Sequence, residues 1–276
     1  MSLPALDREK DGHQNSYRLL QGLSTFIENV NGTLSDSVLV REVVAKRTEV
    51  GADPRKLRIG FTTKPWKSHE VDLECVDAID EAAKLCEDLG HDVEEASPEI
   101  DESAAVNALW IIITAQTHAL LQRATPMLGR QATLEDVETV TWAWSEDARR
   151  FSASDYAEAI TTVHRTGRVV GRFFTAYDIL MTPTMCTPPH KLSEVIMMRT
   201  DIEAYRNIVA GDVGFTQLFN AGGNPAMSVP LHWSAEGLPV GVQFVAPFGD
   251  EATLFRLAAQ LETARPWPNR RSAQTF

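Results

Sequence analysis

A strand–helix–strand pattern between residues 57 and 95 constrains the fold of this chain most. Leu57–Phe61 is a short apolar run, and Gly90 stands at the end of a helical stretch, just before a second strand at His91–Glu95. Apolar residues recur in the helical stretch at steps of three and four positions: Val76, Ile79, Ala83, Cys86 and Leu89. Because short turns join the three elements, we expect the two strands to be parallel neighbours with a right-handed crossover.

Further strands are predicted in the second half of the chain. One strand covers residues 178–182, where Ile179, Leu180 and Met181 are consecutive apolar residues. Two more, Ala226–Leu231 and Val240–Val245, flank the turn at Ser234–Gly237 and should pair as a hairpin. A parallel unit and a hairpin together predict an α/β protein whose mixed β-sheet is flanked by helices.

Helices should supply those flanking layers. The stretch from Ala104 to Phe174 is rich in alanine and reads as several helices packed on a sheet face or covering a cleft. Pro183, Pro188 and Pro189 exclude a helix directly after the third strand, and we expect a mobile segment from there to about Gly211. A last helix is expected after the N-cap residue Asp250, and Pro266 should end it.

Composition excludes several classes of protein. The 276-residue chain has a net charge of −12, which argues against binding to nucleic acid. We find no apolar run long enough to span a bilayer, and the opening MSLPALDREKDGHQ lacks a signal peptide's apolar core, so we expect a cytoplasmic protein without a membrane partner.

Cysteine and histidine spacing gives no sign of a disulfide or a metal site. Cys75 and Cys86 fall about 16 Å apart along one predicted helix, which is beyond disulfide reach. The chain has neither an HExxH nor a CxxC motif, so we expect no bound metal.

Several motifs in series resemble the amidase signature family. They are FNAGGNPA at Phe219–Ala226, Ser228–Pro230, Gly237–Gln243, LRIGF at Leu57–Phe61, YDILMTPT at Tyr177–Thr184 and the stretch Gly249–Trp267. The family commonly has Gln where Asn224 stands, so an amide is retained there. The resemblance divides the chain into a poorly matched segment, 1–56, and an amidase-like C-terminal domain, 57–276, whose fold would be incomplete.

The resemblance implies hydrolysis of carboxylic amides through a serine acyl-enzyme, without metal or organic cofactor. In the family a second serine, on a cis peptide and served by a lysine, activates the nucleophile. This sequence contains no Ser-Ser or Ser-Gly pair and no GxSxG, and Gly222-Gly223 is its only Gly-Gly pair. Because Gly32–Val38 resembles a family segment that follows the nucleophile, we expect the catalytic apparatus to lie before Met1 and assign no catalytic residue here.

Substrate-binding residues are predicted at two places. The family packs the segment around Gly222–Asn224 beside the serine-rich loop, so its backbone and the Asn224 amide are expected to face substrate; the alternative is a simple strand-entry turn. The end of the third strand is the second place, since open α/β sheets bind ligands there. The predicted residues are Thr182, Cys186, Asn220, Gly222, Gly223 and Asn224.

Other candidates have alternative explanations. Cys186 and His190 suggest a Cys–His nucleophile, but two prolines lie between them and no third orienting group is evident. Asp212 and Gln217 are either polar groups of a cleft or solvated loop residues. The tryptophans Trp110, Trp142 and Trp144 fit a core or an interface better than a substrate platform.

Three functions remain open at this point. The chain is an amidase-family enzyme acting on a small amide, a non-catalytic remnant or pseudoenzyme that binds small amides or a partner, or a half-enzyme completed by another chain. Loss of the segment that normally packs on the sheet would expose apolar surface, so we expect homo-oligomers or association through that face.

Overall fold

The sheet of this protein has five strands in the order β2–β1–β3–β5–β4. The structure, a computed structural model, describes residues 52–66, 69–191 and 194–267. The expectations for residues 1–51, including the resemblance at Gly32–Val38, therefore lie outside the described residues. The strands are β1 (Arg58–Phe61), β2 (Asp92–Glu95), β3 (Ile179–Pro183), β4 (Ala226–Trp233) and β5 (Pro239–Val245).

Both predicted strand pairings are confirmed. β1 pairs in parallel with β2 and with β3, whereas β5 is antiparallel to both β3 and β4. The β4–β5 turn closes through two backbone hydrogen bonds, from Ser234 to Leu238 and from Gly237 to Ser234, each 2.8 Å long. Gly237 has φ +77°, a conformation that glycine adopts without steric cost. The expected mixed α/β architecture is therefore present.

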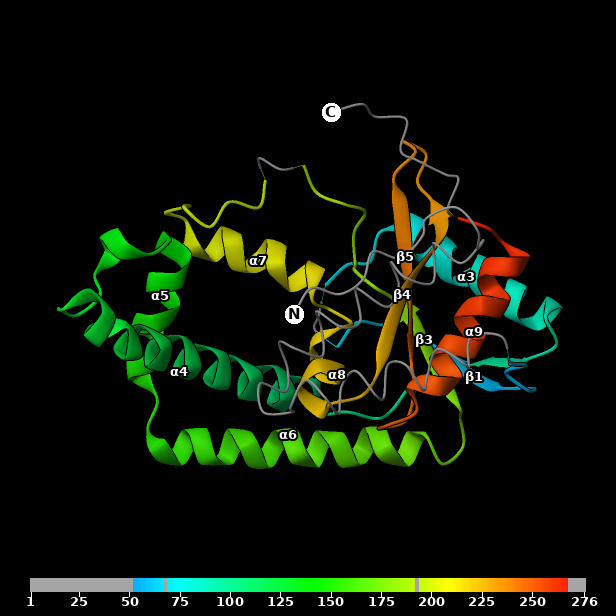
Figure 1. The fold of residues 1–276 in the computed structure, drawn as a ribbon, viewed down its shortest axis with the longest axis horizontal. Coiled ribbons are helices and arrows are strands. Elements are labelled where there is room, and N and C mark those ends of the chain that lie inside the picture. The colour runs from blue at the N-terminus through cyan, green and yellow to red at the C-terminus, as the bar shows by residue number, and fades with distance from the viewer. Residues whose placement is uncertain (1–51, 67–68, 192–193, 268–276) are drawn as a thin grey trace, which may run out of the picture.

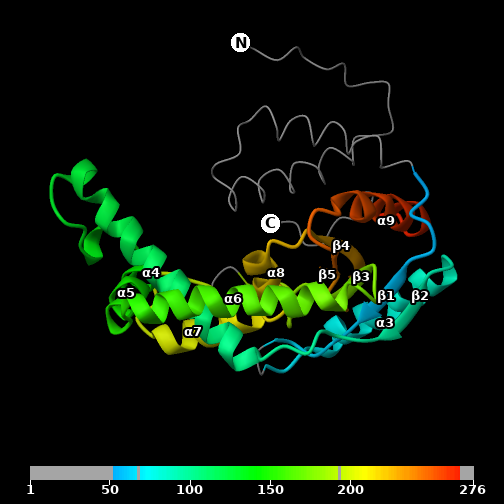
Figure 2. The ribbon, with the colours of Figure 1, turned by 90° about the horizontal axis from the view of Figure 1, so that it is seen from below.

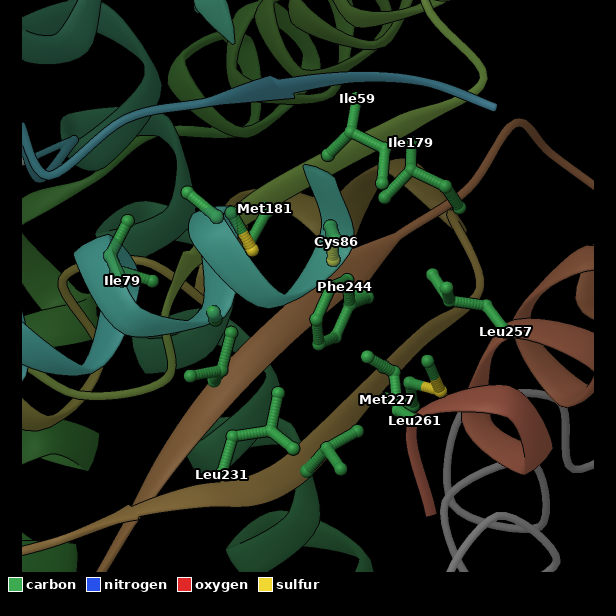
Figure 3. Close-up of a cluster of buried hydrophobic side chains, with 14 of the residues drawn as sticks. Ile59, Ile79, Cys86, Ile179, Met181, Met227, Leu231, Phe244, Leu257 and Leu261 are labelled. Carbon is green, nitrogen blue, oxygen red and sulfur yellow. The ribbon is translucent and has the colours of Figure 1, made fainter. Parts of the chain in front are cut away.

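One face of the sheet is covered by α3 (Leu73–Asp88) and α9 (Glu251–Ala264). Of the periodic apolar residues predicted for α3, Val76 and Leu89 are only half-buried, whereas Ile79 and Cys86 are fully buried in this core. They meet Phe244 and Met181 of the sheet and Leu257 and Leu261 of α9 (Figure 3). Both helices begin at an aspartate whose side chain accepts from the first turn, and Gly90, with φ +93°, follows α3 as predicted.

The other face carries a layer of helices that extends away from the sheet as an arm (Figures 1 and 2). These helices are α4 (Glu102–Leu128), α5 (Thr139–Asp147), α6 (Ala153–Phe173), α7 (Ile202–Asp212) and α8 (Gln217–Gly222). α4 packs along α6 and α5, as expected for the alanine-rich region. Leu180 and Val245 face this layer from the sheet and are buried against Phe219 and Trp66.

A glycine lets α6 approach the sheet. A Cβ added at Gly60 of β1 would lie 2.7 Å from Cζ of Phe173, the last residue of α6. Such a contact would force the ring to move, so the sheet and α6 can be this close only without a side chain at residue 60.

Two sequence expectations about this layer were wrong. The segment expected to be mobile up to Gly211 contains α7, whose N-cap Asp201 accepts a hydrogen bond from the Ala204 backbone and whose Tyr205 is buried. By length and composition α4 also passes as a helix able to cross a bilayer, contrary to the expectation that no run is long enough. In this fold, α4 packs on α5 and α6.

Candidate substrate-binding site

The helical layer contains an open cavity of about 1080 Å³, lined mainly by α4, α6, α7 and α8. Its volume is slightly above the range of about 300–1,000 Å³ that is usual for small-molecule sites. Lining residues of α4 run from Glu102 to Gln116, and a helix rises 1.5 Å per residue, so the cavity is roughly 20 Å long. The walls are mostly apolar, but polar and charged side chains also line them: Glu102, Ser103, Asn107, Gln116, His164, Arg206, Gln217 and Asn220.

The end of the cavity nearest the sheet is built by α8. Gln217 opens this short helix, and Asn220 and Ala221 near its end line the cavity. The ring of Phe219 turns inward against Trp66, with centroids 6.2 Å apart in an edge-to-face arrangement. Burial of Phe219 thus fixes the orientation in which Asn220 and Ala221 face the cavity.

The turn after α8 is held by its own hydrogen bonds. Gly223 caps the helix with φ +73°, and the Asn224 backbone N–H donates to Phe219 O at 3.1 Å. The buried Asn224 side chain donates through Nδ2 to Ala246 O, also at 3.1 Å. Its amide therefore ties the turn to the end of β5, which fits the strand-entry alternative.

A second groove of about 720 Å³ adjoins the main cavity. Gly222 and Asn224 line this groove, whereas Asn220 lines the main cavity, and Ala221 contributes to both. His164 of α6 also contributes to both hollows. The family-like turn therefore lies at the junction of the two hollows.

Aromatic side chains form the opposite end of the cavity. The rings of Trp110 and Trp144 meet edge to face at 5.5 Å, and the Arg206 guanidinium lies 4.0 Å from the centre of the Trp110 ring. Trp110 Nε1 donates to Asp147 at 2.8 Å. Burial raises the pKa of Asp147, but hydrogen bonds from Arg150 and Trp110, together with the Arg206 charge, hold it below its ordinary value. Asp147 is therefore ionised, and its ion pair is with Arg150, at 2.7 Å, whereas Arg206 stacks on Trp110.

Thr182 and Cys186 are placed apart from both hollows. Thr182 is fully buried, accepts a hydrogen bond from Gln243 Nε2 at 2.8 Å and donates to Pro183 O. Cys186 is also fully buried, and burial together with the charge of Asp212 raises the pKa of its thiol to about 11. Both residues stabilise the core in this structure.

The Cys–His alternative finds no geometric support. His190 Nε2 lies 2.7 Å from Asp212 Oδ1, so the imidazole pairs with that carboxylate. Within the described residues no hydrogen bond joins His190 to Cys186. A thiol with a raised pKa and no base in reach is a poor nucleophile.

The main cavity itself holds few groups suited to catalysis. Ser103 of α4 and His164 of α6 both line it, but no hydrogen bond between them occurs among residues 52–66, 69–191 and 194–267. The same ranges contain no cluster of three or more His, Cys, Asp or Glu side chains suited to a metal ion. The described cavity has the form of a binding site without a nucleophile–base pair.

Sequence reasoning found part of this site. Asn220 and Gln217 were singled out, and both line the cavity. Trp110 and Trp144 also line it, although their half-buried rings were read as core or interface. Arg206 was missed because α7 was not predicted, and Trp66 was missed because it follows β1 without a motif of its own.

Fold and cavity together define an α/β protein with a large cavity in the helical layer beside its sheet. The family model described as Amidase matches residues 20–255, and the chain belongs to this family.

Relatives of known name agree with this assignment. The chain is 33% identical over 231 residues to a 6-aminohexanoate-cyclic-dimer hydrolase of Pseudomonas sp. (strain NK87), covering 80% of this chain and 47% of that protein. It is 32% identical over 256 residues to a putative amidase AmiC of Mycobacterium leprae (strain TN), covering 86% of this chain and 53% of that protein. The chain thus spans about half the length of these curated relatives.

Solved structures of amidases also match this chain over about half of their own length. A structure of 6-aminohexanoate cyclic dimer hydrolase superimposes with a TM-score of 0.73 at 31% identity, covering 83% of this chain and 49% of the other. A bacterial aryl acylamidase of the amidase signature family gives a TM-score of 0.67 at 20% identity, which supports the fold alone.

Proposed function

We propose that this chain forms the substrate-binding part of an amide hydrolase. In this proposal a carboxylic amide lies in the cavity between α4, α6, α7 and α8, with its scissile group toward the turn at Gly222–Asn224. The nucleophilic serine, its serine partner on a cis peptide and the lysine come from sequence outside the 276 residues, either in the same polypeptide or in another chain.

The observation that carries this proposal is the position of the family-like motif. The Phe219–Ala226 segment ends α8 at the junction of the two hollows, and Asn220 faces the larger one. An amidase-family chain with a large apolar-walled cavity beside this segment has the means to hold the acyl chain of a substrate. The relatives named above make the 6-aminohexanoate cyclic dimer a suitable first test substrate.

Catalysis by the 276 residues alone is not expected. Acyl transfer needs a nucleophile, a base within hydrogen-bond reach and oxyanion donors in one arrangement. The printed sequence lacks the Gly/Ser-rich signature, and Ser103 has no bonded base in the cavity. Loss of such a set costs on the order of 10⁶ in kcat in a serine protease.

Complementation tests the proposal. The 276-residue chain would be assayed on the 6-aminohexanoate cyclic dimer and with a serine-directed fluorophosphonate, alone and mixed with the N-terminal half of the Pseudomonas hydrolase. We expect neither turnover nor labelling by the chain alone, and both in the mixture, with the label on the added half. Stoichiometric labelling of this chain alone would overturn the proposal.

A second candidate is a non-catalytic domain that binds amides or a partner. The absence of a paired nucleophile and base from the described cavity favours it. Amide binding without activity in any mixture with an intact N-terminal half would support this candidate over the first.

A further inference from the structure

Arg206 of α7 is a cation in the cavity wall with no anionic partner in the described part of the chain. The side chain is half-buried and lines the main cavity. Among residues 52–66, 69–191 and 194–267, no carboxylate oxygen lies within 4.0 Å of its guanidinium, and no acceptor takes a hydrogen bond from it. Because arginine stays charged and carries five N–H donors, a guanidinium in this position is suited to an anion from outside.

The carboxylate of Asp147 is already engaged by other groups. Its Oδ1 accepts from Arg150 at 2.7 Å, and its Oδ2 accepts from Trp110 Nε1 at 2.8 Å. The charges of Asp147 and Arg150 cancel within their ion pair. The charge of Arg206 is therefore in excess at this end of the cavity.

Packing holds Arg206 in an orientation that suits a carboxylate. Its guanidinium lies 4.0 Å from the centre of the Trp110 ring, and the neighbouring Tyr205 packs against Trp144 with ring centroids 6.4 Å apart. A guanidinium that stacks on a ring uses its face for that contact and keeps its N–H edges available. Two parallel N–H groups on such an edge match the two oxygens of a carboxylate.

Open volume lies next to this guanidinium. A hollow of about 410 Å³ adjoins the main cavity, and Trp110, Trp144 and Arg206 line both. Glu146 also lines the hollow, but it is exposed and pairs with Arg149 at 3.1 Å. A small anionic group can therefore reach Arg206 from the cavity.

From Arg206 toward α8 the wall is apolar. Trp110 is five residues beyond Ala105, which belongs to the same apolar cluster as Phe219 of α8. A helix rises 1.5 Å per residue, so the Arg206 site lies about 7–8 Å along α4 from the end of the cavity at α8. Val106 lines the cavity in between. A ligand that spans this distance has a carboxylate head and an apolar body, because apolar groups gain from burial against such a wall.

We propose that Arg206 determines specificity by binding the carboxylate of a ligand whose apolar body lies along α4 toward α8. The consequence for substrates rests on the proposed function: the amides that the completed enzyme favours carry a carboxylate remote from the scissile bond. A neutral head group gains no ion pair at Arg206, and an ammonium group meets a like charge there. Discrimination by head-group charge is therefore the signature of this site.

Calorimetric titration of the full 276-residue chain tests the ligand class. Octanoate, octanamide and octylamine share one chain length, and near neutral pH their head groups are negative, neutral and positive. We expect octanoate to bind at least tenfold more tightly than octanamide, and octylamine to bind most weakly. Added salt should narrow the difference between octanoate and octanamide, because it screens the ion pair. Equal affinity for these two ligands, or no binding of octanoate, would overturn the proposal.

Substitution of Arg206 tests the residue itself. Arg206→Gln removes the charge, and we expect octanoate affinity to fall at least tenfold while octanamide affinity stays within twofold, which shows that the cavity is intact. Arg206→Lys keeps the charge without the planar pair of donors and should lose less, about threefold.

Arg168→Gln is the matched control, because it removes the same charge from α6 at a position that lines the second groove. Its octanoate affinity should stay within twofold of the unsubstituted chain. Unchanged octanoate affinity in Arg206→Gln, or an equal loss in Arg168→Gln, would overturn the proposal. Because binding is read without hydrolysis, these outcomes are separate from failure of the complementation experiment.

Discussion

Asp178 and Arg58 bind each other through both backbone and side chain at the start of β1 and β3. The Asp178 backbone N–H donates to Arg58 O at 2.8 Å, and Asp178 Oδ2 accepts from the Arg58 backbone N–H at 2.9 Å and from its Nε at 3.3 Å. Arg55 adds a further contact to the same carboxylate at 3.3 Å. The aspartate that precedes the predicted third strand therefore sets the register of two strands that are 120 residues apart in sequence.

This pairing predicts a dependence of stability on pH. Burial raises the pKa of Asp178, but hydrogen bonds from Arg58 and the charges of Arg58 and Arg55 bring it below its ordinary value. A lowered pKa in the folded state gives stability that is present above the unfolded-state value, near 4, and is lost as pH falls through the folded-state value. Asp178→Asn should lower the free energy of unfolding by about 1 kcal/mol near neutral pH, because Arg58 is half exposed and its charge is screened.

Urea unfolding at several pH values checks this expectation. The difference between Asp178→Asn and the unsubstituted chain should shrink toward acid pH. Asp92→Asn is the control, since the pair of Asp92 with Lys56 joins two exposed side chains and should be worth about 0–0.5 kcal/mol. An equal loss of unfolding free energy in Asp178→Asn and Asp92→Asn would contradict this explanation.

Gly241 of β5 lies against two hydroxyl groups that form a hydrogen bond with each other. Thr184 Oγ1 and Ser228 Oγ lie 2.7 Å apart, and a Cβ at residue 241 would lie 2.8 Å and 2.5 Å from them. Gly241→Ala should therefore cost about 1–3 kcal/mol of stability, because it forces both side chains to move. Denaturant midpoints measure this loss, and Ser228→Ala in the same chain should recover part of it.

Gly167→Ala is the matched control for that substitution. A Cβ at Gly167 meets nothing within 4 Å, and the residue lies in the interior of α6. We expect this variant to be as stable as the unsubstituted chain or up to about 1 kcal/mol more stable. Destabilisation of both variants would show that close contact at residue 241 is not the cause.

The thiols of this protein should be unreactive in the folded state. Burial raises the pKa of Cys75 and Cys86 to about 12, and burial with the charge of Asp212 raises that of Cys186 to about 11. Iodoacetamide near neutral pH should alkylate none of the three cysteines before unfolding and all of them in urea, as mass spectrometry would show. Rapid alkylation of Cys186 that abolishes a measured hydrolysis would revive the Cys–His nucleophile.

Association through exposed apolar surface remains a prediction. Leu120 and Met127 are seven residues apart on α4, share one face and are 58% and 90% exposed. We expect light scattering to show a dimer of the chain, and Leu120→Glu with Met127→Glu to give a monomer. Leu73→Glu is the control, because Leu73 is 77% exposed but lies on α3, which covers the other face of the sheet. A monomeric unsubstituted chain would refute the prediction.

Local sequence patterns were sufficient for the sheet. Alternation of apolar runs with turn residues located the strands near Arg58, Ile179, Ala226 and Val240, and Gly90 marked the end of α3. These signals are local, since a turn or a cap depends on residues a few positions apart. The family-like motifs at Phe219–Ala226 belong to the same kind of local information.

Local patterns were insufficient for α7 and α8. The prolines after β3 indicate only that no helix follows at once. The helix α7 starts well beyond them, after the N-cap Asp201, and an aspartate is equally typical of a turn. α8 is only six residues long, too short for a periodic pattern, and it is stabilised by the burial of Leu218 and Phe219. Tertiary packing therefore decides both helices.

Patterns that are contiguous in the chain were enough to predict the α/β class, the strand pairings and membership in the amidase family. Which side chains line the cavity together depends instead on how the helices pack on the sheet. Trp66, Trp144 and Gln217 are separated by 73 residues or more along the chain, and none belongs to a common motif. They line one cavity because α4 and α6 extend away from the sheet while α8 packs against α6, and no local pattern encodes that arrangement.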